Sequence, residues 1–230
     1  RSPKMKRVVK QLGKLAKNDG PVLLSGPSGS GKAFLAARLH KKQGLDPQAP
    51  FIMLDCREID ATRSKETLFG SGQNLPEDSH AIRFKSLHDY GTIHLAEGGT
   101  LVLRNLEALE LETLAAVNDY ATEIAAGSST LPECRIMATT EVDPGELGLR
   151  EEFFKPLLDH LLEGHVQVPA LRDRRKDILA LARLLLADRE GGDTKKFSRG
   201  AENGLLNKKY FQNNVRELKD AIDLAVLVAE

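Results

Sequence analysis

Short apolar runs alternate along the chain with stretches whose apolar residues recur at helical spacing. The runs that have the length and composition of strands cover residues 22–25, 51–55, 100–103, 135–139 and 166–168. Between the third and fourth run, an apolar stripe follows one face of an expected helix, through Leu114, Val117, Ala121 and Ile124. Strands that alternate with helices predict an α/β fold, in which a parallel sheet is covered by helices on both faces.

Beyond Pro169 the strand pattern disappears, and the apolar positions follow helical spacing alone. The expected helices cover residues 177–189, 199–208 and 215 to the end of the chain. We therefore predict an αβα subdomain over residues 1–169 and a small all-helical lid over residues 170–230. A capping box, formed by Asn214 with Glu217 three positions later, is expected to begin the last helix.

The bulk composition predicts a compact protein of the cytoplasm. Lys and Arg number 33 and match 33 Asp and Glu, so no global charge would recruit nucleic acid or an anionic membrane. Cys56 and Cys134 lie in apolar surroundings, as expected for reduced core thiols and not for a disulfide or metal site. No apolar run has the length that spans a bilayer. The start at Arg1-Ser2-Pro3 is typical of an excised fragment, so flanking domains are expected outside this sequence.

A glycine-rich turn follows the first expected strand and precedes the next expected helix. Its residues are Gly26, Pro27, Ser28, Gly29, Ser30, Gly31 and Lys32. In such a loop backbone N–H groups surround a polyphosphate, while the lysine and the helix start add positive charge. The next position is Ala33, where many such loops carry a hydroxyl for magnesium. We interpret the segment through Ala33 as nucleotide-binding; a glycine-rich turn without a ligand is the alternative.

Several motifs follow this loop in the order in which one family carries them. They are Pro50 to Cys56 (PFIMLDC, against PFV.VNC), Glu66 to Gly70 (ETLFG, against ESELFG), Ala96 to Leu103 (AEGGTLVL, against A.GGTLFL), Leu171 to Ile178 (LRDRRKDI, against LRERREDI) and Asn214 to Leu218 (NVREL, identical). Over nearly its whole length the chain thus resembles the central AAA+ domain of sigma-54-dependent transcription activators, the bacterial enhancer-binding proteins. The resemblance implies a P-loop AAA+ fold, with a Rossmann-like αβα sheet and a helical lid, that binds ATP or ADP and assembles into hexameric or heptameric rings.

The resemblance assigns further nucleotide contacts. Thr139 or Thr140, at the end of the fourth strand, would sense the γ-phosphate, although both are also ordinary strand-end residues. Arg216 would reach phosphate oxygens when the lid closes; a surface salt bridge with Glu217 or Asp220 is the alternative. The binding side of the site is therefore expected to be intact.

The third strand departs from the family at its catalytic acids. The family ends this strand in Asp-Glu, which hold magnesium and polarise the attacking water, whereas this chain has Arg104 and Asn105. Without both carboxylates we expect little hydrolysis. Mg²⁺ should bind poorly, because a cation ~4 Å away repels it by several kcal/mol at an effective dielectric constant of ~20. Arg104 either faces the phosphates in place of magnesium, or lies in solvent or pairs with Glu107 or Glu141.

Two other family features are missing from the sequence. The GAFTGA loop that grips sigma-54 has no counterpart between Ser71 and Gly91, and an extended loop is predicted over residues 71 to 78. An ungapped alignment puts Phe154 and His160 where the family has arginines that reach the neighbouring subunit; a shifted register would supply Arg150. The sequence therefore argues against sigma-54 remodelling and leaves a homo-oligomeric ring open.

The leading interpretation is an ATP- or ADP-binding AAA+ domain of a transcription regulator or related signalling protein. It would be deficient in hydrolysis and would use nucleotide as an assembly or conformational switch, with no catalytic or metal-binding residue assigned. One alternative is an active ATPase that takes its carboxylate from Glu107, Glu110 or Glu141. Another is a module for a different nucleotide, such as a cyclic dinucleotide. DNA contact is expected only through domains outside this chain.

Overall fold

The structure, a computed structural model that describes residues 2–70, 87–145, 160–189 and 195–228, contains a parallel sheet. Its strands are β1 (Val22–Ser25), β2 (Phe51–Asp55), β3 (Thr100–Arg104), β4 (Arg135–Thr140) and β5 (Val166–Gln167). They lie in the order β2-β3-β4-β1-β5, and the pairs β2–β3, β3–β4 and β1–β4 are parallel. The α/β fold predicted from the alternating runs is confirmed.

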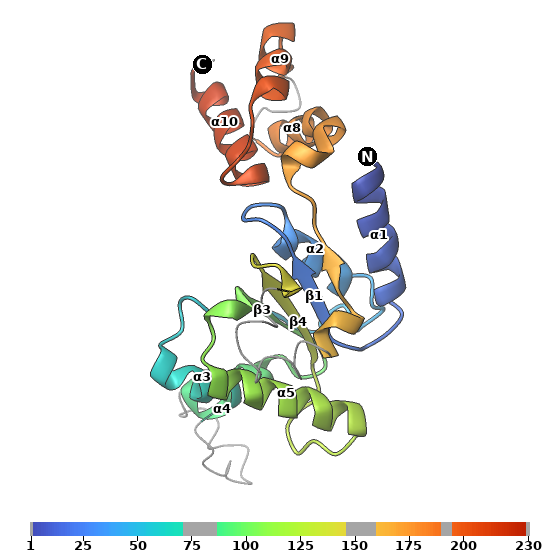
Figure 1. The fold of residues 1–230 in the computed structure, drawn as a ribbon, viewed down its shortest axis with the longest axis vertical. Helices are drawn as coiled ribbons and strands as arrows, with labels where there is room; N and C mark the ends of the chain where they lie inside the picture. The colour runs from blue at the N-terminus through green and yellow to red at the C-terminus, as the bar shows by residue number, and fades with distance from the viewer. Residues whose placement is uncertain (1, 71–86, 146–159, 190–194, 229–230) are drawn as a thin grey trace. The chain divides into compact units, whose positions relative to one another are not determined.

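Helices cover the sheet because the strands β1, β3 and β4 bury both sets of alternating side chains. The helices that accompany the strands are α1 (Pro3–Leu15), α2 (Lys32–His40), α3 (Ser64–Phe69), α4 (Leu87–Leu95) and α5 (Leu111–Ala126). Leu101 and Leu103 of β3 pack in one core with Leu114 and Val117 of α5, as the apolar stripe predicted. Val102, which points to the opposite face, is also fully buried. Figure 1 shows α3, α4 and α5 grouped together beside β3 and β4.

The C-terminal region is helical, as predicted. A 3-10 helix over Leu171–Asp177 leads into α8 (Ile178–Ala187), α9 (Arg199–Asn207) and α10 (Asn214–Val228). These elements enclose a separate apolar core, made of Leu171, Ile178, Ala182, Leu186, Tyr210, Leu218 and Ile222. The hydroxyl of Tyr210 donates to the carbonyl of Leu205 at 2.8 Å, so the polar group of this buried side chain has a hydrogen-bond partner.

The chain divides into two compact units that do not follow a single boundary in the sequence. One unit contains Arg1–Gln11, Gly26–Lys32 and Gln167–Glu230, and the other contains Leu12–Ser25 and Ala33–Val166. The glycine-rich loop is therefore in the same unit as the C-terminal helices, while the strand before it and most of the helix after it are in the other. The subdomain boundary at residue 169 stays a prediction.

Three smaller expectations concern chemistry and topology. Cys56 and Cys134 are buried free thiols, as predicted, and burial raises the pKa of Cys56 to about 12. In the part of the chain that the structure describes, no helix is long and apolar enough to cross a bilayer, and no cluster of acids, histidines and cysteines is arranged for a metal. The predicted loop over residues 71 to 78 lies outside the described residues, as do Phe154 and Arg150.

Candidate nucleotide-binding site

The phosphate-binding loop joins the end of β1 to the start of α2. Gly26 and Gly29 have φ angles of 141° and 65°, which residues with a side chain rarely adopt. The amide of Ser30 donates to the carbonyl of Pro27 at 3.2 Å and closes a turn inside the loop. Because α2 begins at Lys32, its first N–H groups face the same segment. The local geometry is that of an anion-binding loop at a helix start.

Lys32 is folded over its own loop. Its ammonium donates to the carbonyl of Gly26 at 2.6 Å and to that of Pro27 at 3.1 Å, and the residue is only 8% exposed. The ammonium is thus held by two backbone oxygens of its own loop. Ala33, the next residue of α2, supplies no hydroxyl.

Residues from the C-terminal helical region bind the carbonyls of this loop. The amide of Asn214 donates to the carbonyl of Ser28 at 2.8 Å, and the guanidinium of Arg174 donates to that of Ser30 at 2.5 Å. Burial lowers the pKa of Arg174, an effect that the nearby carboxylate of Asp177 partly offsets. The sequence motifs contained both Arg174 and Asn214, but no local pattern marked them as partners of the loop.

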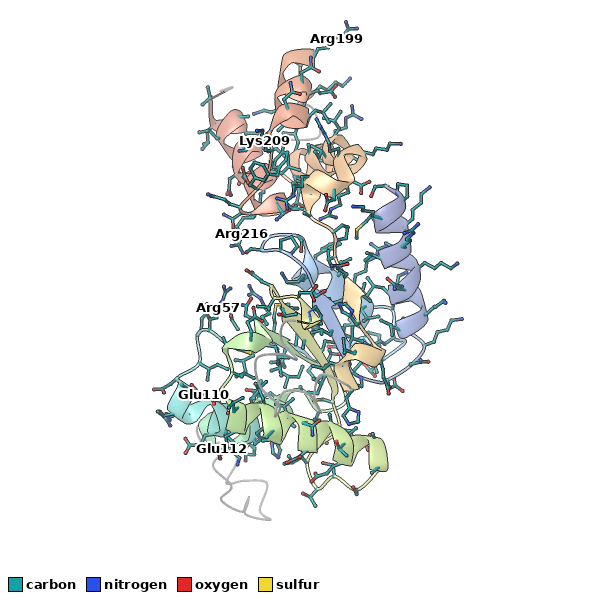
Figure 2. The ribbon with its side chains drawn as sticks, in the orientation of Figure 1. Arg57, Glu110, Glu112, Arg199, Lys209 and Arg216 are labelled. Atoms are coloured by element: carbon teal, nitrogen blue, oxygen red, sulfur yellow. The ribbon has the colours of Figure 1, made fainter. Side chains whose placement is uncertain are left out.

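The start of α10 differs from the expected capping box. The side-chain oxygen of Asn214 accepts from the backbone N–H of Leu171 at 2.7 Å, so the asparagine connects segments and does not cap its own helix. Glu217 pairs with Lys208 at 3.5 Å. Among the described residues, Arg216 has no ion-pair partner, so the alternative of a salt bridge with Glu217 or Asp220 is not seen. Arg216 is exposed in the first turn of α10 (Figure 2).

At the carboxyl end of the sheet, Arg104 and Asn105 are both bound to Asp55. The parallel register aligns Asp55 of β2 with Arg104 of β3, which explains why positions far apart in the sequence meet. A nitrogen of Arg104 lies 3.5 Å from one carboxylate oxygen, and the side-chain amide of Asn105 donates to the other at 2.7 Å. The partner of Arg104 is therefore Asp55, and neither Glu107 nor Glu141, the two acids considered from sequence.

Asp55 is the hub of this end of the sheet. Its side chain is 9% exposed, and Arg57, which follows β2 (Figure 2), lies 3.4 Å from the same oxygen that accepts from Asn105. Burial alone would raise the pKa of Asp55, but hydrogen bonds from Asn105 and Arg57 and the charge of Arg104 lower it below its usual value. The carboxylate is thus ionised and neutralised by its own neighbours.

The remaining predicted residues at this edge are engaged locally. Thr139 lies beside Arg104 in the register of β4, and its hydroxyl accepts from the backbone N–H of Asn105 at 3.3 Å. The hydroxyl of Thr140 accepts from the N–H of Val142 at 3.0 Å. Glu107 accepts from the N–H of Glu141 at 3.2 Å. The structure thus brings Arg104 and Thr139 together with Asp55, which sequence reasoning missed.

His160, one of the two residues aligned with inter-subunit arginines, faces α5. Its Nε2 atom lies 3.4 Å from the hydroxyl of Thr122. An imidazole is shorter than an arginine side chain. His160 thus contacts its own chain, and the absence of inter-subunit cations stays a prediction.

A parallel sheet in this strand order, a phosphate-binding loop after β1 and a C-terminal helical region define a P-loop domain of the AAA+ class. The family model described as "Sigma-54 interaction domain" matches residues 1–167. The chain belongs to this family of transcription-regulator domains.

Individual relatives agree with this assignment. The chain is 33% identical to the response regulator PilR of Pseudomonas aeruginosa, over all of this chain and 52% of PilR. It is 32% identical to the anaerobic nitric oxide reductase transcription regulator NorR of Escherichia coli O157:H7, over 99% of this chain and 45% of NorR. The chain therefore spans about half the length of these relatives.

Solved structures show the same fold. NtrX from Brucella abortus in complex with ADP aligns with a TM-score of 0.78 at 23% identity, over 99% of this chain and 50% of NtrX. The ATP complex of NtrX aligns with a TM-score of 0.76 at the same identity, over 99% of this chain and 51% of NtrX.

Proposed function

We propose that this chain is an ATP- or ADP-binding AAA+ domain of a transcription regulator that hydrolyses nucleotide poorly and uses it as an assembly or conformational ligand. The observation that carries the proposal is the binding of Arg104 and Asn105 to Asp55. The family has two free acids where this chain has a cation and an amide that are already bonded. Without a carboxylate at these positions, nothing there polarises an attacking water.

Nucleotide binding is supported by groups that do not depend on those acids. The backbone of the loop, the start of α2 and the ammonium of Lys32 are the groups that hold phosphates in P-loop proteins. NtrX, whose solved structures contain ADP or ATP, has the same fold. Arg216 is the residue we assign to the phosphates on lid closure, and Thr139 or Thr140 to sensing of the γ-phosphate. Closure would shift the population of conformations by no more than the differential affinity of the nucleotide for them.

The residues present do not fit Mg²⁺. Ala33 has no hydroxyl, and Arg104 places a positive charge where the family has a carboxylate. Mg²⁺ prefers carboxylates and phosphate oxygens in a strict octahedral arrangement, and a neighbouring cation opposes it. We therefore infer that Arg104, released from Asp55, and Lys32 supply the positive charge for the phosphates in place of a metal.

The proposal includes the cellular compartment and the partners of the domain. We expect the protein to act in the cytoplasm, to contact DNA only through other parts of the regulator and to lack sigma-54 remodelling. Because Phe154 and His160 occupy the positions of the family's inter-subunit arginines, ring assembly would need a cation from another position to reach a neighbouring subunit. Nucleotide-dependent oligomerisation, measured by light scattering, tests this part separately.

Calorimetric titration of ATP in Mg²⁺ and then in EDTA tests the proposal. We expect affinities that agree within about threefold, because Arg104 stands in for the metal. Lys32→Ala should weaken binding at least about tenfold, whereas Lys41→Ala, an exposed lysine just beyond the same helix, should not. Phosphate release by the unaltered chain should equal that of Lys32→Ala. Strict dependence on Mg²⁺ contradicts the stand-in role of Arg104, and lysine-dependent turnover contradicts the hydrolytic deficiency.

An active ATPase is the second candidate, and one observation favours it. Glu107 uses one carboxylate oxygen for the N–H of Glu141, while its other oxygen is buried with no hydrogen-bond partner among the described residues. A buried carboxylate with unused acceptor capacity is a candidate base. Glu107→Gln would abolish turnover in this case and would leave ATP binding unchanged.

A further inference from the structure

The outer side of the phosphate-binding loop is held at consecutive carbonyls by donors from the C-terminal helical region. The side-chain amide of Asn214 donates to Ser28, the backbone N–H of Val215 donates to Gly29 at 3.0 Å, and Arg174 donates to Ser30. These donors and acceptors lie in one compact unit. The loop is thus bound from behind by a small set of groups, which we call the loop clamp.

The clamp also sets the direction of amides inside the loop. A peptide group is planar, and its C=O and N–H point in opposite directions. When Asn214 fixes the carbonyl of Ser28, it therefore directs the N–H of Gly29 to the other side. Arg174 does the same for the N–H of Gly31 through the carbonyl of Ser30. The peptide between Gly29 and Ser30 serves a different purpose, because the N–H of Ser30 closes the turn on Pro27.

Both clamp side chains are held in a single orientation. Asn214 is 1% exposed, and because its oxygen accepts from Leu171, its nitrogen must face Ser28. Arg174 is 5% exposed, and its other terminal nitrogen lies 3.4 Å from the sulfur of Met5. Buried donors of this kind are costly to leave without acceptors, so they hold the loop carbonyls firmly.

Close packing at Gly29 shows the same approach of the two segments. A Cβ atom at this position would lie 2.0 Å from the carbonyl oxygen of Asn213, which directly precedes Asn214. The backbone before α10 therefore reaches the loop at a distance that only glycine permits. Side-chain bonds and backbone contact together connect the loop to the helical region.

We propose that Arg174 and Asn214 are positioning residues of the nucleotide site, which hold the Gly29 and Gly31 amides toward the phosphates from the far side of the loop. The proposal rests on the proposed function, in which this loop binds nucleotide. It also implies that a movement of the helical region is transmitted to the loop, since the clamp joins them.

Glycine amide signals in NMR spectra test the clamp without nucleotide. The chain has 19 glycines, so selective ¹⁵N-glycine labelling gives a spectrum that can be assigned. Asn214→Asp keeps the acceptor for Leu171 and removes the donor to Ser28, so it should shift Gly29 more than Gly31. Arg174→Met should shift Gly31 more than Gly29. Arg175→Met is the matched control, because Arg175 donates to a carbonyl within the helical region, that of Leu206 at 2.7 Å.

Nucleotide affinity tests the role of the clamp in binding. We expect Asn214→Asp and Arg174→Met each to weaken ATP and ADP about tenfold, and Arg175→Met to leave both unchanged. If Arg174→Met does not fold, Arg174→Lys, which keeps the charge and most of the volume, is used in its place. Unshifted Gly29 and Gly31 signals in folded variants overturn the clamp. Shifted signals with unchanged affinity overturn its role in binding. If the unaltered chain binds neither nucleotide, the proposed function fails, while the glycine signals still decide whether the clamp exists.

Discussion

The phosphate-binding loop and the carboxyl end of β3 are both held by short polar contacts, but the contacts use different groups. In the loop, Lys32, Asn214 and Arg174 bind backbone carbonyls, and the backbone N–H groups are the elements that we propose bind the phosphates. At β3 the side chains of Arg104 and Asn105 are themselves bound to Asp55. Binding built from backbone survives changes of side chain, whereas catalysis that needs two carboxylates is lost with them.

The largest effect is expected where the loop contacts the helical region. Gly29→Ala should lower the free energy of unfolding by about 3 kcal/mol, since the new Cβ meets the oxygen of Asn213 and φ is unfavourable. Gly127→Ala is the matched control: its φ is 66°, but nothing lies within 4 Å of the added atom. The control should cost about 1 kcal/mol. Urea denaturation measures both free energies of unfolding. If Gly29→Ala and Gly127→Ala lowered them equally, the loop and the helical region would not be in close contact.

An intermediate effect is expected at the end of the sheet. Asp55→Ala removes the acceptor shared by Arg57, Arg104 and Asn105 and should cost about 2 kcal/mol at pH 7. Exposed Glu58, nearby on the chain, provides the control Glu58→Ala, which should change stability by less than about 0.5 kcal/mol. A cost for Asp55→Ala no larger than that of the control would mean that Asp55 does not hold Arg104.

The pKa of Asp55 also predicts how the stability of the chain changes at acidic pH. Its pKa lies below the ordinary value of 3.8, so the unfolded chain takes up the proton first as pH falls. The stability contributed by Asp55 is therefore present above about pH 3.8 and is lost as the pH drops through the folded-state pKa. Asp55→Ala should flatten this part of the stability profile, and an unchanged profile would contradict the assignment.

The smallest effect concerns His165, which lies outside both regions. Its Nε2 atom is 2.7 Å from the hydroxyl of Ser25, at the end of β1. Burial lowers its pKa below 6.5, against the opposing charge of Asp143. Because the unfolded state then binds the proton more readily, stability should fall slightly as pH decreases below 6.5. His165→Gln should reduce this slope in denaturation measured between neutral and mildly acidic pH; a slope identical to that of the unaltered chain would assign it to other groups.

Local patterns predicted the elements closely. The runs beginning at Val22 and Phe51 are strands with the predicted bounds, because buried strands show as short apolar segments whatever their neighbours are. The motif from Gly26 to Lys32 also predicted a glycine-rich loop before a helix, because the glycines and the start of the helix are both local features of the sequence. The capping box at Asn214 was wrong, because a buried acceptor on Ser28 and a donor on Leu171 compete for the same side chain.

By itself, the amino-acid sequence determined that the chain forms an α/β P-loop domain and that acids are missing after the third strand, since periodicity and residue identity are local properties. Tertiary structure alone decided which groups meet there. Asp55 reaches Asn105 from 50 positions away, and Arg174 and Asn214 reach the loop from 144 and 186 positions away. Such pairs depend on strand register and on the packing of buried polar groups, which no spacing along the chain specifies.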